Sequence, residues 1–429
     1  MKVAILTTFA DFDRSYSLCG VVLEQAGMLI ANGVNFDLFV NEVGPRLNDK
    51  SIDEHAWLAD HIRKEVPTGK LEEDVINDEV CEKTEEWLRG IAEDYDVIIT
   101  HDWMFTTWFV SYNQAVRNVA PDFPGTTWVH WVHSAPGGRP NRLVGAAALR
   151  YQTAPNSLYV YLNESDRLAY AESLGTDLSD VMTCYNPLDA ASFFGGTTRL
   201  ANFVRKHRLW DHDIMQVYPL SMPRADAKQL DALIVMFSEW KRLGYKVKLV
   251  VVNAHTTHEN EKKVVEQYQF MAKTDHKLNS RELIFTSSEG EPWEYSVPYE
   301  DVQALLRLSN LFVFPSKSEA CSRILQEASM AGCLVVGNES FPPMGEFLDP
   351  KVRQYTFGSL RWEVKHAISE PQWLREVAKS MLPMFDHPVM KQKQHMMRLA
   401  AWETIWREQF LPILERAKMM NEARKAVMA

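Results

Sequence analysis

Apolar runs of strand length alternate with helical patterns along most of this chain. Within the first hundred residues, strand-like runs at 2–8, 36–40 and 96–103 accompany a helical pattern at 17–33. A second series of strand-like runs follows at 126–134, 158–164 and 181–187. Strands that alternate with helices pair in parallel and carry helices on both faces of the sheet. This part of the chain therefore predicts a doubly wound α/β domain.

The segment 48–96 interrupts this series because it is rich in Asp and Glu. Its apolar residues, such as Trp57, Leu58 and Ile62, have helical spacing. We interpret the segment as solvated helices, and its negative charge makes it a poor surface for phosphate.

Turn-forming residues at Asn186–Asp189 end the first series, and a new one begins at Ile214. Strand-like runs at 214–221, 246–253, 282–287 and 311–316 alternate with helical patterns at 227–244 and 299–309. A chain of 429 residues also exceeds what one hydrophobic core normally holds. We therefore predict two Rossmann-like domains, at 1–190 and 191–400. Residues 401–429 have an amphipathic pattern that Pro412 kinks, and we expect this helix to pack back toward the first domain.

Composition and charge exclude several classes of protein. With 46% hydrophobic and 24% charged residues, the chain is typical of a globular protein. No apolar run approaches the roughly 20 residues that span a bilayer. The five cysteines are widely spaced and contain no CxxC pair, which argues against a disulfide framework or zinc site and favours the reducing cytoplasm. A formal net charge of −11 disfavours general attraction to nucleic acid or anionic lipid.

The segment from Pro315 to Gly332 carries the most informative chemistry. A strand-like run ends at Pro315, and a helical pattern begins near Ser322. Free backbone N–H groups at a helix start, aided by the helix dipole, form a site for a diphosphate. Glu319 lies before this helix and Glu327 lies two turns along it, so the two carboxylates can reach opposite ends of an elongated ligand. A nucleotide sugar has that shape.

This segment resembles the signature of the family-4 retaining glycosyltransferases, a P-S-x-x-E turn followed by a second glutamate eight positions after the first. The resemblance implies the GT-B fold, in which two Rossmann-like domains face a cleft. It places the acceptor on the first domain and the nucleotide sugar on the second. It also implies that Glu319 contacts the donor sugar, that Glu327 binds the ribose hydroxyls, and that Ala320, Cys321 and Ser322 provide amides for the diphosphate.

Further matches follow in the order of the family. The run ending in His101 and Asp102 resembles the strand and loop that face the acceptor. His133 resembles a histidine near the donor sugar, and His130 competes for that role on the opposite face of the strand. Gly20 stands where the backbone of family members closely approaches the phosphates, although Cys19 replaces a second glycine there. In the segment that leads out of the first domain, Pro187 replaces the glycine that is usual in the family.

Arg224 and Lys228 correspond to the basic pair that neutralises the leaving diphosphate, at a slightly shorter spacing than usual. No DxD-type motif is evident near a strand end, so we expect a metal-independent transferase without a cofactor. The resemblance favours a UDP-sugar over a GDP-sugar as donor. A dinucleotide-dependent dehydrogenase is disfavoured, because no GxGxxG lies between a strand and a helix.

Two acceptors stay open. Most of the family modifies saccharides. The sequence at 308–332 and 340–348, however, looks like that of bacteriophage members, which suggests a hydroxymethylated base in DNA as the acceptor. A base in duplex DNA must be flipped out, which requires cationic and aromatic side chains. Two segments provide them: Arg199, Arg205, Lys206, His207, Arg208 and Trp210, and then Arg139, Arg142 and Arg150. A catalytically silent protein that binds nucleotide sugars is the remaining alternative.

Overall fold

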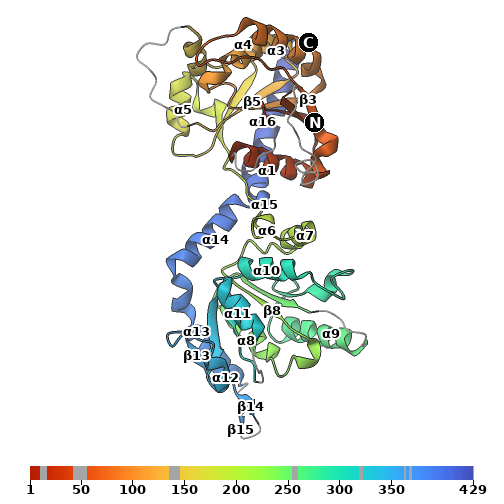
Figure 1. Cartoon of the computed structure of the whole chain (residues 1–429), viewed down its shortest axis with the longest axis vertical. Coiled ribbons are helices and arrows are strands. Elements are labelled where there is room, and N and C mark those ends of the chain that lie inside the picture. The colour runs from red at the N-terminus through yellow and green to blue at the C-terminus, as the bar shows by residue number, and fades with distance from the viewer. Residues whose placement is uncertain are drawn as a thin grey trace. The chain divides into compact units, whose positions relative to one another are not determined.

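The chain forms two compact units, seen in the computed structural model (Figure 1). The structure describes residues 1–9, 17–41, 56–134, 145–253, 259–317, 322–361, 364–366 and 370–428. The first unit consists of Met1–Leu188 and Trp402–Ala429, and the second consists of Asp189–Ala401. Each unit is built around its own parallel sheet.

The first unit contains a seven-stranded sheet with the order β3-β2-β1-β4-β5-β6-β7. Its strands are β1 (Lys2–Leu6), β2 (Asn35–Asn41), β3 (Ile62–Val66), β4 (Val97–His101), β5 (Thr127–Val132), β6 (Ser157–Tyr161) and β7 (Val181–Thr183). All neighbouring pairs are parallel. The main helices are α1 (Ser17–Ala31), α3 (Asp78–Ile91), α4 (Val110–Val119) and α5 (Arg167–Leu174).

Alternate residues of these strands enter two separate hydrophobic cores. Ala4 and Leu6 of β1 pack in one core, whereas Val3 and Ile5 pack in the other. Both faces of the sheet are therefore covered, as parallel sheets require. This explains why the central strands have nearly continuous apolar sequences.

The second unit contains a six-stranded parallel sheet with the order β10-β9-β8-β11-β12-β13. Its strands are β8 (Ile214–Pro219), β9 (Val247–Val252), β10 (Leu283–Phe285), β11 (Leu311–Val313), β12 (Leu334–Asn338) and β13 (Gln354–Tyr355). A short antiparallel hairpin joins β14 (Ser359–Arg361) to β15 (Val364–His366). The helices are α6 (Ala190–Phe193), α7 (Thr198–His207), α8 (Leu230–Arg242), α9 (Glu259–Thr274), α10 (Tyr299–Leu308), α11 (Arg323–Met330), α12 (Pro342–Gly345), α13 (Pro371–Ser380) and α14 (Pro388–Ala400).

The predicted fold class is confirmed, since both sheets are parallel and doubly wound. In each sheet the order of strands reverses once, between β1 and β4 in the first unit and between β8 and β11 in the second. Ligands of such sheets bind outside the carboxyl ends of the strands at this switch point. The strand order therefore selects the segments after β1, β4, β8 and β11 as candidates for a site.

Two local predictions are wrong. Ile62 begins strand β3 instead of continuing a helix, because Arg63, Lys64 and Glu65 give this edge strand a charged sequence that obscures its strand pattern. The helix expected from residue 227 begins at Leu230, since Gln229 adopts a left-handed backbone with φ of 53°.

The last segment of the chain belongs to the first unit. It runs through α15 (Trp402–Ile405), a π-helical turn (Trp406–Phe410) and α16 (Leu411–Met428). The π-turn ends two residues before Pro412, whose missing N–H interrupts regular helical bonding. Asn421 Nδ2 donates to Asp96 O at 2.7 Å, and Arg424 Nε donates to Pro124 O at 2.9 Å. Of the helices that the structure describes, none is both long and apolar enough to cross a membrane.

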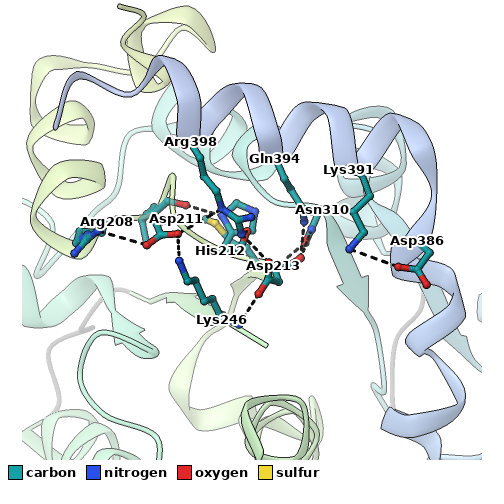
Figure 2. Close-up of polar contacts among 12 residues, drawn as sticks. Arg208, Asp211, His212, Asp213, Lys246, Asn310, Asp386, Lys391, Gln394 and Arg398 are labelled. Atoms are coloured by element: carbon teal, nitrogen blue, oxygen red, sulfur yellow. Dashed lines mark hydrogen bonds and ion pairs between the residues drawn. The ribbon is translucent and has the colours of Figure 1, made fainter. Parts of the chain in front are cut away.

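Within the second unit, a polar cluster ties helix α14 to the rest of the unit (Figure 2). Arg398 donates to His212 O and, at 2.7 Å, to Asp213 Oδ1. Gln394 donates to Asp213 O, and the other oxygen of the Asp213 carboxylate accepts from Lys246 N at 2.8 Å. These bonds fix the end of α14 to the loop before β8.

Candidate functional sites, one in each unit

A cationic turn follows β8 at the switch point of the second sheet. The turn includes Met222–Arg224, and Lys228 N donates to Arg224 O at 2.9 Å, so Lys228 lies one turn beyond Arg224. Arg224 is exposed, whereas only 8% of Lys228 is exposed. The Lys228 Nζ lies 4.9 Å from the centroid of the Phe314 ring. Of the two predicted diphosphate cations, Lys228 therefore lies beside the end of β11, and Arg224 lies one turn before it in the chain.

Backbone and amide contacts hold this turn against the segment after β11. Lys317 N donates to Ala227 O at 2.8 Å. Gln229 Nε2 donates to Pro315 O at 2.6 Å and to Phe357 O at 2.8 Å. The segments that follow β8 and β11 thus meet at one edge of the sheet.

Helix α11 begins at this edge with Ser322 as its N-cap. Ser322 has extended backbone angles, and its buried hydroxyl has no hydrogen-bond partner among the described residues. The first N–H groups of the helix lack intrahelical partners, which suits an anion. Glu319, Ala320 and Cys321 lie outside the described residues, so the structure says nothing of their predicted roles.

Glu327 is held in place on α11. Its Oε1 accepts from Tyr299 OH at 2.8 Å and from Arg323 Nε at 2.7 Å. Arg323 Nη2 also donates to Tyr299 OH at 2.9 Å, which closes a three-residue network. Sequence reasoning missed Tyr299, because the first residue of a distant helix has no recognisable spacing from Glu327.

The first unit brings His101, Asp102 and His133 together after β4 and β5. His101 Nδ1 lies 2.9 Å from His133 Nε2. The Asp102 Oδ1 accepts from His133 N at 2.8 Å, and burial raises the pKa of that carboxyl. Burial also lowers the pKa of His133 to about 4 and holds the pKa of His101 well below its usual range. Both imidazoles are therefore neutral at physiological pH.

His130 has a different environment from His133. It is 1% exposed within β5, and its ring nitrogens lie 2.8 Å from Thr100 Oγ1 and 2.9 Å from Ser157 Oγ. Because both nitrogens are already partnered inside the sheet, His130 serves the core. His133, just beyond β5, is the one that shares the carboxyl edge with His101 and Asp102.

Gly20 lies in the first turns of α1, the helix that follows β1. A Cβ placed on Gly20 would have no heavy atom within 4 Å, so space adjoins its backbone. Cys19 beside it is buried. Gly20 therefore lies next to the switch point of the first sheet, with room on its open side.

The predicted basic segment is largely engaged within the second unit. Lys206 Nζ and His207 Nε2 contact the two oxygens of Glu289 at 2.6 and 2.8 Å. Trp210 is 5% exposed and belongs to the core. The other three cations have their own contacts: Arg199 with Gly290 O at 3.1 Å, Arg205 with Asn202 Oδ1 at 3.0 Å and Arg208 with Asp211 Oδ2 at 3.4 Å.

Of the second basic group, Arg139 and Arg142 lie outside the described residues. Arg150 Nε donates to Phe105 O at 2.7 Å, in the turn that follows Asp102. Within the described part of the chain, no group of three or more His, Cys, Asp or Glu side chains could hold a metal ion.

Fold and site together define an α/β protein with two Rossmann-type units and a candidate anion site at the switch point of the second. No family model and no curated protein matches the chain. Among solved structures, HepE from Anabaena in complex with UDP is 13% identical over 97% of this chain and 100% of that chain, with a TM-score of 0.35.

Two further structures are similar at the same level. A glycosyltransferase from Rickettsia africae ESF-5 is 14% identical, covers 98% of both chains and has a TM-score of 0.38. The sucrose-phosphate synthase from Thermosynechococcus elongatus is 12% identical over 100% of this chain and 99% of its own, with a TM-score of 0.32. Because these scores are low, the fold class rests on the strand order of the two sheets.

Proposed function

We propose that this protein is a glycosyltransferase that moves a sugar from a nucleoside-diphosphate donor, with a UDP-sugar favoured, to an acceptor hydroxyl. One observation carries the proposal. Arg224 and Lys228 follow β8 at the switch point of the second sheet, and the bonds from Lys317 N and Gln229 Nε2 join their turn to the segment that leads from β11 toward α11. Two cations and unpaired helix amides are the groups that a diphosphate requires.

The proposed reaction proceeds with retention and without a metal. Arg224, Lys228 and the α11 amides stabilise the negative charge that develops on the leaving diphosphate. Glu327 binds the ribose hydroxyls, and Glu319 contacts the donor sugar. The acceptor hydroxyl attacks from the side of the leaving group, and its proton passes to a phosphate oxygen. The protein contributes by positioning the reactants and by electrostatic stabilisation.

The acceptor is proposed to be a saccharide or a hydroxymethylated base in phage DNA. The internal pairing of Lys206 and the burial of Trp210 leave fewer groups in the basic segment for a DNA backbone. Arg208 remains an exposed cation of that segment to test.

The test measures release of free nucleoside diphosphate from a panel of UDP- and GDP-sugars, with and without hydroxymethylcytosine DNA or oligosaccharides. We expect slow hydrolysis of one donor by the native protein and a large loss in Arg224→Ala. Stimulation by the modified DNA identifies a base-modifying enzyme, and stimulation by an oligosaccharide identifies a saccharide-directed one. Release from no donor would contradict the proposal and favour a silent binding protein.

A further inference from the structure

The two histidines at the carboxyl edge of the first sheet form a direct pair. His101 ends β4 and is 2% exposed, and its Nδ1 lies 2.9 Å from Nε2 of His133, which follows β5. Their ring centroids are 5.2 Å apart, and the ring planes differ by 31°. At this separation one nitrogen must carry a proton and the other must accept it.

Burial keeps both rings neutral, so the pair shares one proton between the facing nitrogens. Two arrangements are then available. In the first, His101 Nδ1–H donates to His133 Nε2, and His133 carries its own proton on Nδ1. In the second, His133 Nε2–H donates to His101 Nδ1, and His133 Nδ1 is a bare acceptor.

The outer nitrogen of His101 distinguishes the two arrangements. His101 Nε2 is buried and has no hydrogen-bond partner among the described residues. The second arrangement leaves an N–H group unpaired there, whereas the first leaves only a lone pair. Buried N–H groups without a partner are the rarer of the two in proteins. The first arrangement is therefore the favoured one.

The turn at Asp102 fixes the main chain from which the His133 ring projects. Asp102 has a φ of 59°, which is unusual for a residue other than glycine. Its N donates to Trp131 O at 2.9 Å, and its Oδ1 accepts from His133 N at 2.8 Å. Strained residues that the surrounding structure holds in place cluster at functional sites. The turn therefore orients His133 as well as its partner.

We propose that His101 is a positioning residue that sets the tautomer of His133, so that His133 presents a fixed N–H donor at Nδ1 to a hydroxyl oxygen of the bound ligand. The identity of that ligand as a sugar donor or acceptor rests on the proposed function. In this arrangement His133 donates a hydrogen bond and does not act as a base, because its only other ring nitrogen is already occupied by His101.

The first test needs no activity. Nitrogen-15 NMR of the full chain at neutral pH separates protonated from bare imidazole nitrogens, and the His101→Asn and His133→Gln variants assign the signals. We expect the proton of His133 on Nδ1 and that of His101 on Nδ1. A proton on His133 Nε2 would overturn the proposal.

The second test uses kinetics with conservative rescue. His101→Leu removes the hydrogen bond, lets His133 populate both tautomers and lowers kcat/KM roughly tenfold. His101→Asn supplies an amide N–H where Nδ1 stood, so activity returns to within about twofold of the native value. The affinity for free UDP stays unchanged in both variants. Equal loss in the Asn and Leu variants would show that the imidazole is only structural.

His130→Leu is the matched control, since it removes another buried histidine from the same pair of strands. It lowers the melting temperature but leaves the His133 tautomer and kcat/KM of the folded protein unchanged. Failure of the proposed function has a separate signature, which is the absence of donor release by the native protein even when NMR finds the expected tautomers.

Discussion

At the scale of single residues, buried histidines determine how acid affects this protein. Burial lowers the pKa of His130 to about 3 and those of His133 and His212 to about 4. In the unfolded chain these groups titrate near 6.5. The stability that these three histidines contribute is therefore fully present above about pH 6.5 and is lost as pH falls toward 4, because only the unfolded chain takes up the protons.

His212→Asn tests this dependence. His212 Nδ1 donates to Leu209 O at 2.6 Å, and the Asn amide can keep that bond while removing the titration. We expect the dependence of the unfolding free energy on pH, between about 6.5 and 4, to fall by roughly 1.4 kcal/mol per pH unit. Urea unfolding at a series of pH values measures it. The exposed His395→Asn, which removes an imidazole outside the core, serves as the control.

Glu327 and Glu319 are predicted to have separable roles. Glu327→Ala removes the carboxylate held by Tyr299 and Arg323, and we expect UDP affinity to fall about tenfold or more, as for loss of a charge-assisted hydrogen bond. Glu319→Ala is expected to lower kcat with little change in UDP affinity. Calorimetry and steady-state kinetics separate the two effects. Equal and negligible effects in both variants contradict the site.

At the scale of elements, Gln229 joins the ends of β11 and β13 to the turn after β8. Its amide donates to Pro315 O and Phe357 O in a fully buried position. Gln229→Ala removes the donor to Phe357 O and leaves Pro315 O only the longer bond from Asn338 Nδ2 at 3.4 Å, so we expect a loss of about 1–3 kcal/mol in unfolding free energy and weaker UDP binding. The exposed Gln372→Ala, measured by the same denaturant titration, should change stability by less than about 0.5 kcal/mol.

The contact between α1 and the start of α15 depends on a glycine. A Cβ on Gly27 would lie 2.4 Å from the Trp402 ring, whose Nε1 donates to Glu24 Oε2 at 2.6 Å. Gly27→Ala therefore displaces Trp402, and we expect a loss of roughly 1–3 kcal/mol from overpacking. Gly90→Ala in α3 meets no atom within 4 Å and should not destabilise the protein. Thermal unfolding of both variants decides whether the close approach matters.

The elements that sequence reasoning identified are those whose burial is continuous. The central strands of both sheets are apolar on both faces, and Ser322 marks the start of α11 as expected. The sequence did not predict edge strand β3, because its charged residues obscure the apolar pattern of a strand. The sequence also did not predict the contacts of Gln229 and Tyr299 or the pairing of His101 with His133. These contacts join residues far apart in the chain, so no local spacing in the sequence indicates them.

At the scale of the whole molecule, the return segment completes the core of the first unit. Ile405, Phe410, Ile413, Leu414 and Ala417 are fully buried there. Removing 402–429 uncovers these contacts, and each large apolar side chain contributes about 1.5–3 kcal/mol on burial. The total is comparable to the 5–15 kcal/mol by which typical domains are stable, so the first unit should unfold.

Two-dimensional NMR of the chain 1–401 checks this expectation. Signals of the second unit should keep their dispersion, since its sheet is formed entirely by residues 189–401. Signals of the first unit should collapse. Removing only residues 427–429 is the control, because Val427 and Met428 are 88% and 71% exposed. If the signals of both units keep their full dispersion in the shortened chain, residues 402–429 are not needed to complete the core of the first unit.

The divided first unit also affects how the protein is made. A ribosome synthesises residues 1–188 first, then the whole second unit, and only then the helix that covers the core of the first. At about 5–20 residues per second, the 189–401 segment delays that helix by roughly 10–40 s. Throughout this interval the second unit can fold as it emerges, while the first carries an uncovered apolar face. The nascent chain should therefore recruit chaperones through its earliest part and release them only after translation has passed Ala417.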